Sequence, residues 1–258
     1  MVFGLLIDVP PTHPDTVLTT LIYLEKTLKN FGMQYVHLSV GLQLYQTACF
    51  LQWSDPDRWK ALVLHPGMMH MLMSFLGCIG TLMKASGLDV LLTAAFGGVT
   101  GITTGKSWTN ALRAYRLVMS VLLQDFFQSG VKTYQELDEY LEIARQHPSG
   151  KLWADCLIKL TLIAMQLLRA EREGDFLLKQ VSLKAMMPYF FAAGHRNYAS
   201  YMTWYLRQAE NLPEAATQSV GRQYQQTSLV NRPTSSEERC RWTKRHLHKC
   251  RSSCSLGQ

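Results

Sequence analysis

The run from residue 64 to 83 is the densest apolar stretch in the chain and most constrains its fold. A proline, Pro66, near its start followed by almost continuous apolar residues predicts a turn that leads into a buried helix. His65, Pro66 and His70 interrupt the run, so its uninterrupted part, residues 71–83, is shorter than the roughly 20 residues that a membrane span needs. We therefore expect a core helix and no association with a membrane.

The composition of the 258-residue chain is that of an ordinary globular protein, with 47% hydrophobic and 17% charged residues. This is enough to form one sizeable core, with or without an appendage. Three of the six cysteines lie in apolar helical stretches, which indicates a reducing compartment and no disulfide framework. The N-terminus has no basic residue before Asp8 and Pro10, so it does not resemble a signal peptide. We expect a nuclear or cytoplasmic protein that is not secreted.

The hydrophobic periodicity predicts a predominantly α fold with a few short strands, an α+β arrangement. Alternating or short apolar runs favour strands at residues 2–7, 35–40 and 60–64, with Gly41 at the C-terminal end of the second. Residues 97–106 are expected to form a glycine-rich loop. Helical spacing and capping residues predict helices at about residues 16–30, 42–53, 67–83, 88–96, 107–128 (capped by Ser107), 134–147 (with a capping box from Thr133 and Glu136), 150–173, from 175 with interruptions at Pro188 and Gly194, and 198–211.

We divide the chain into a body, residues 1–213, and a tail, residues 214–258. The tail is rich in Gln, Ser, Thr, Arg and Pro and poor in large apolar residues, so we expect it to be disordered. Residues 231–258 contain seven basic and two acidic side chains, which is +5 of the net charge of +7. The body is therefore close to neutral, and the positive charge is concentrated in the tail.

The basic tail is the main candidate for contact with nucleic acid. Its cations suit phosphate groups, and its tryptophan could stack on a base. A solvated tail and a nuclear address are equally open interpretations. The residues concerned are Arg239, Arg241, Trp242, Lys244, Arg245, Lys249 and Arg251.

Weak candidates for a metal site are found in the body and in the tail. His70 lies on the predicted core helix and has no visible partner ligands, so a structural role is the simpler interpretation. The tail has thiol and imidazole groups whose spacing matches no standard zinc finger: Cys240, His246, His248, Cys250 and Cys254. The loop that ends at Gly105, Lys106 and Ser107 lacks the first glycine of a phosphate-binding loop, so we expect no nucleotide.

Several blocks of the sequence resemble a family of transposon-derived animal proteins that is catalogued mostly as a domain of unknown function. The resemblance extends over about residues 1–213. The blocks that carry it are PPTHPDTVLTT (10–20), LQLYQTACFLQW (42–53), LHPGMMHMLMSFLGCIG (64–80), RAEREGDF (169–176) and MMPYFFAAGHRNYA (186–199).

The resemblance implies the remnant of an RNase H-like core, as in transposases that bind two divalent metals through acidic residues at strand ends. In that family an aspartate is expected after the strand equivalent to residues 35–40, and this chain has Gly41 there. Compared with the family, we also expect the chain to be shortened at both ends. The block around His70 is similar to the helix that follows the corresponding strand, which implies a structural or metal-adjacent role for this histidine.

These observations lead to three hypotheses about function. The first is a catalytically inactive, transposon-derived protein without a cofactor that binds DNA through the tail or protein through the body. The second is a residual metal-dependent nuclease that uses other carboxylates, such as Asp8 and Asp55. The third is a helical module that binds only proteins.

Overall fold

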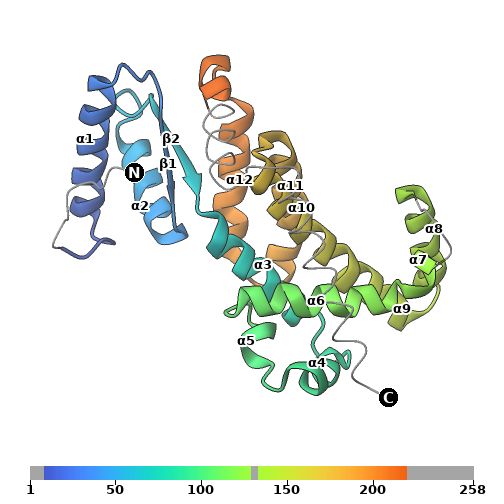
Figure 1. The fold of residues 1–258 in the computed structure, drawn as a ribbon. Helices are drawn as coiled ribbons and strands as arrows, with labels where there is room; N and C mark the ends of the chain where they lie inside the picture. Colours follow the sequence, from blue (N-terminus) through green and yellow to red (C-terminus); the bar gives the residue numbers. More distant parts are fainter. Residues whose placement is uncertain (1–8, 129–132, 220–258) are drawn as a thin grey trace, which may run out of the picture.

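A computed structural model describes residues 9–128 and 133–219 of the chain. This part is mostly helical and contains one two-stranded parallel sheet, which confirms the predicted fold class. Figure 1 shows the sheet with α1 and α2 at one end of the molecule and α7, α8 and α9 at the other. Because a single strand–helix–strand unit is common to many folds, the RNase H-like ancestry remains a prediction.

The sheet is formed by β1 (Val36–Val40) and β2 (Leu62–Pro66), which are joined by the crossover helix α2 (Leu42–Ser54). Helix α1 (Pro14–Asn30) precedes them and packs against α2. The predicted strand at residues 35–40 is confirmed, and the strand predicted at 60–64 begins and ends two residues later. The strand predicted at residues 2–7 lies outside the described part of the chain.

The two faces of the sheet differ in chemistry. Side chains alternate along each strand, so paired residues of β1 and β2 share a face. The face toward α1 and α2 is apolar and carries Val36, Leu38, Leu62 and Leu64. The opposite face carries His37, Ser39, Val63 and His65, and helix α12 (Arg196–Glu210) packs over its β2 side.

Helix α3 (Met68–Leu82) is at the centre of the molecule, where it contacts α5, α6, α10 and α11. Its glycines lie directly against the chain around α5 (Thr100–Thr103), a short helix within the predicted loop. A Cβ atom at Gly77 would lie 2.8 Å from the carbonyl oxygen of Thr104, and one at Gly80 would overlap the backbone of Thr103. The run that dominates the sequence therefore forms a core helix that follows β2, as predicted.

Most of the buried side chains belong to one cluster around α3, which we call the main core. It joins the apolar face of the sheet to α3, α6 (Trp108–Leu122), α10 (Lys159–Glu173), α11 (Phe176–Ala192) and α12. Its fully buried members include Tyr45, Phe75, Leu76, Ile79, Tyr115, Leu160, Leu183, Met186 and Phe190.

A smaller cluster, which we call the peripheral core, lies at the far end of α6. It is formed where α7 (Gln124–Gln128), α8 (Tyr134–Arg145), α9 (Pro148–Leu152) and the π-helical turn η1 (Trp153–Ile158) meet. Its buried members are Met119, Leu123, Phe126, Leu137, Leu141, Ala154 and Ile158. The predicted capping box at Thr133 and Glu136 is confirmed at the start of α8.

Three helix predictions need correction. Pro188 does not interrupt α11, because packing along α10 and α12 compensates for the hydrogen bond that proline removes. The helix predicted at residues 107–128 is divided into α6 and α7, and Ser107 accepts a hydrogen bond from the Asn110 side chain instead of capping the backbone. The helix predicted from residue 150 to 173 begins at Pro148 and includes the π-helical turn.

The predicted body–tail boundary after Pro213 also differs from the structure. Residues 214–219 are helical, Thr217 N–H donates to the carbonyl oxygen of Pro213, and Ala216 is completely buried. The ordered chain therefore extends at least to Ser219, and the rest of the predicted tail lies outside the described residues. Within the described part, no helix is long and apolar enough to cross a membrane.

Candidate functional site

The strand-end position at which the resemblance implies a metal ligand is occupied by Gly41. It lies between β1 and α2, and the nearest side-chain atom to an added Cβ would be Nδ1 of His70, 3.9 Å away. His70 is exposed in the first turn of α3. A side chain at position 41 would therefore face His70, but glycine itself offers no ligand atom.

The alternative carboxylates do not meet at this position. Asp55 follows the last residue of α2, whereas Gly41 precedes its first residue, so about 20 Å of helix separates them. Asp8 lies outside the described residues. In residues 9–128 and 133–219, no three His, Cys, Asp or Glu side chains are grouped closely enough to hold a metal ion.

The other predicted site residues lie in two places. All the metal and nucleic-acid candidates from Arg239 to Cys254 fall outside the described part of the chain. The loop before α6 is packed against α3, and the N–H groups of Gly105 and Ser107 donate to the carbonyl oxygens of Ile102 and Gly101. These two N–H groups are therefore already used and do not form a phosphate cradle.

The structure instead shows a chain of polar side chains on the second face of the sheet, which we call the histidine chain. His37 Nε2 lies 2.5 Å from Ser219 Oγ, and His37 Nδ1 lies 3.2 Å from His65 Nε2. His65 Nδ1 lies 3.1 Å from the hydroxyl of Tyr205. The histidine chain therefore links β1, β2, α12 and the helical turn at residues 214–219.

The hydrogen-bond partners favour one direction for the protons along the histidine chain. The hydroxyl of Ser219 donates to the carbonyl oxygen of Ala216, 2.9 Å away, so its oxygen accepts from His37 Nε2–H. Neutral His37 then accepts at Nδ1 from His65 Nε2–H, and His65 accepts at Nδ1 from the Tyr205 hydroxyl. In this arrangement both imidazoles are neutral and each of these protons has an acceptor.

Burial keeps both histidines neutral. The pKa of His65 is lowered to about 3, first by burial and then by the positive charge of Lys179 and by His37. Burial also lowers the pKa of His37, whose ring is less deeply buried. A proton on His65 would have to be desolvated near Lys179, which is itself buried and bonded to Glu171 over 2.7 Å.

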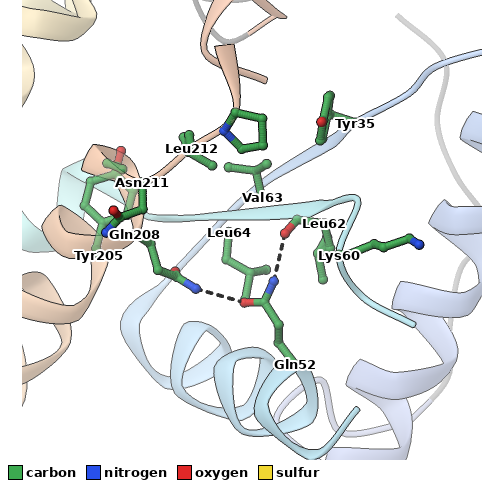
Figure 2. A pocket seen from close by; sticks show the side chains of 12 residues that line it. Tyr35, Gln52, Lys60, Leu62, Val63, Leu64, Tyr205, Gln208, Asn211 and Leu212 are labelled. Atoms are coloured by element: carbon green, nitrogen blue, oxygen red, sulfur yellow. Dashed lines mark hydrogen bonds between the residues drawn. The ribbon is translucent and has the colours of Figure 1, made fainter. Parts of the chain in front are cut away.

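The unpaired edge of β2 is closed by a second polar contact with α12, next to a pocket of about 230 Å³. Figure 2 shows that Gln52 Nε2 donates to the carbonyl oxygen of Leu62, 2.8 Å away, while its side-chain oxygen accepts from Gln208 over 3.3 Å. Val63 and Leu64 point to opposite sides of the strand in the same view. Tyr205 therefore holds α12 against β2, and Gln208 holds it against Gln52 of α2.

The sequence analysis missed the histidine chain. It named His65 only as an interruption of the apolar run, and it assigned no role to His37, Tyr205 or Ser219. The bonded pairs are 28, 140 and 182 residues apart, so no local spacing could indicate them. The signal that the sequence did offer was one histidine within each of the two strands, His37 in β1 and His65 in β2.

Comparison with known families gives a classification without a function. Residues 2–145 and 128–235 match the model of a family described as Domain of unknown function (DUF8702). The chain belongs to this family. The second DUF8702 match continues past Pro213, as does the ordered structure. No curated protein and no solved structure matches the chain significantly.

Proposed function

We propose that this DUF8702 protein is a transposase-derived, non-catalytic protein that binds nucleic acid through its basic segment, residues 231–258. The observation that carries the proposal is Gly41: the strand end where a metal ligand is expected has no side chain, and the side-chain atom nearest to an added Cβ belongs to an exposed histidine. The charge distribution supports the binding half of the proposal, because seven of the nine charged residues in this segment are basic.

Salt-dependent binding of labelled DNA by the full chain tests this proposal. We expect the affinity for a short duplex and for a single strand to fall steeply between 50 and 200 mM salt, because binding releases counterions from phosphates. Replacing four tail cations with glutamine should reduce the log–log salt slope by about one unit for each lost phosphate contact. The four are Arg241, Lys244, Arg245 and Lys249.

A matched variant removes the same number of cations from the body, where all four side chains are exposed: Lys84, Lys106, Arg113 and Arg116. It should retain most of the salt slope. Equal losses in the two variants, or binding that does not depend on salt, would contradict a role for residues 231–258. Strand cleavage or transfer by the wild-type chain that requires Mg²⁺ or Mn²⁺ would contradict the non-catalytic half of the proposal.

Protein binding through α4 (Leu88–Phe96) is a second candidate function. This helix is strongly apolar, yet Val90 is 68% exposed and Leu91 52% exposed. Adjacent apolar side chains on one exposed helix are typical of a contact surface. Replacing both with glutamate should lower the association of the purified protein measured by sedimentation velocity at increasing concentration, and a wild-type chain that stays monomeric would exclude self-association as this contact.

A further inference from the structure

The turn at residues 214–219 is attached to the sheet by a polar contact with a titratable residue of β1. Ala216 is completely buried, and Ser219 Oγ accepts the hydrogen bond from His37 Nε2–H. The turn follows α12 directly after Leu212 and Pro213, and the basic segment lies further along the chain. Its attachment therefore fixes the last described residues before this segment to the sheet.

A second proton on His37 disturbs the whole histidine chain. His37 Nδ1–H would then point at His65 Nε2–H, so His65 would have to move its proton from Nε2 to Nδ1 and donate to Tyr205. The Tyr205 hydroxyl would lose the acceptor that it has in the neutral chain. A buried hydroxyl without an acceptor and a desolvated imidazolium are both unfavourable.

In the described part of the chain, the groups that are hydrogen-bonded to His37 carry no negative charge. His37 contacts His65 across the sheet and Ser219 of the turn. Tyr205 of α12 contacts the other nitrogen of His65. Lys179 of α11 and Glu171 of α10 form an ion pair behind these groups. Burial lowers the pKa of His65 and raises that of Tyr205, and the charges of Lys179 and Glu171, respectively, add to these shifts. Protonation of His37 is thus disfavoured while the turn is in place.

We propose that residues 214–219 form a latch that His37 holds on the sheet when neutral and releases when it takes up a proton. Once released, these residues move together with the chain that follows, so the attachment of the basic segment to the body responds to pH. The functional consequence rests on the proposed nucleic-acid binding, but the latch itself does not.

The direction of the pH dependence follows from linkage. Burial, to which the contact with Ser219 contributes, holds the pKa of His37 below its ordinary value of 6.5, so release of the turn should raise this pKa toward that value. The closed state is therefore fully favoured above about pH 6.5 and loses stability as the pH falls below it. Between pH 7.5 and 5.5 the opening equilibrium should rise by up to about tenfold, since opening takes up at most one proton at His37.

Hydrogen exchange of the full chain tests the latch. Mass spectrometry measures the exchange of a peptide that covers residues 214–219, and the rates are corrected for the intrinsic effect of pH on exchange. In the wild-type chain, the protection factor of this peptide should fall by up to about tenfold between pH 7.5 and 5.5. His37→Gln keeps an Nε2–H donor for Ser219 but cannot titrate, so its protection should not change with pH. His70→Gln removes an exposed histidine elsewhere and should behave like wild type.

Ser219→Ala removes the acceptor without changing the core, and it should lower protection already at pH 7.5. A wild-type latch whose protection is independent of pH, or a pH dependence that persists in His37→Gln, would overturn the proposal. Equal protection in Ser219→Ala and wild type would overturn it as well, even if His37→Gln failed to fold. A chain that binds no DNA but shows the expected exchange would refute the proposed function and leave the latch intact.

Discussion

The main core and the peripheral core of the protein are stabilised in different ways. The main core includes close backbone contacts at glycines of α3, and between α10 and α11 the buried Lys179 side chain pairs with Glu171, which is 28% exposed. Among the residues that the structure describes, the peripheral core contains seven buried side chains, and its helices are secured by a capping box and by the partly exposed pair of Arg145 and Asp155. Equivalent substitutions should therefore cost far more in the main core than in the peripheral core.

The largest difference is expected for the two ion pairs. Glu171→Gln should lower the free energy of unfolding by about 3 kcal/mol, because it removes the carboxylate that compensates the buried charge of Lys179. Asp155→Asn makes the same change in the peripheral pair, whose side chains are 22% and 33% exposed, and should cost less than about 1 kcal/mol. Urea unfolding of both variants measures the difference, and equal costs would contradict the comparison.

Close packing at α3 gives the next largest effect. Gly80→Ala should destabilise the protein by about 2 kcal/mol, because the new methyl group overlaps the backbone of Thr103 and one helix must move. Gly98→Ala is the control, since no neighbouring atom lies within 4 Å of its Cβ position. Its unfolding midpoint should stay within the small range of surface substitutions, and a Gly80→Ala midpoint equal to it would show that α5 is not tightly packed.

The smallest effect is expected at the capping box of α8. Thr133→Ala removes the side chain that accepts from Glu136 N–H and should cost about 1 kcal/mol. The loss should be local: hydrogen exchange should become faster in α8 while α3 and α10 remain protected. Uniformly faster exchange in both cores would mean that they unfold together and that the distinction between them has no energetic meaning.

The sequence predicted elements whose signals are local. The strand at residues 35–40 and the core helix after Pro66 were confirmed because alternation and apolar density are properties of short windows. The capping box at Thr133 was confirmed because its two residues are three apart. Pro188 was misinterpreted because packing against the neighbouring helices α10 and α12, which the local sequence around the proline does not reveal, supports the continued helix.

The candidate site was much less predictable than the fold. Gly41 and His70 were identified from the resemblance, and the structure brings them close to each other. The histidine chain could not be predicted, because Tyr205 and Ser219 reach His65 and His37 only after α12 has packed on the sheet. The boundary after Pro213 failed for the same reason: a turn with one buried alanine is ordered by its docking and not by its composition.

One continuous helical path, from Pro148 to Glu173, takes part in both cores. Ala154 and Ile158 of η1 belong to the peripheral core, whereas Leu160 and Leu167 of α10 belong to the main core. The π-helical turn contributes to both cores itself, because Ala154 and Ile158 lie in the peripheral core and Leu157 lies in the main core. It therefore couples the two cores: opening of α7 and α8 would remove the packing partners of Ala154 and Ile158 while Leu157 stays packed in the main core.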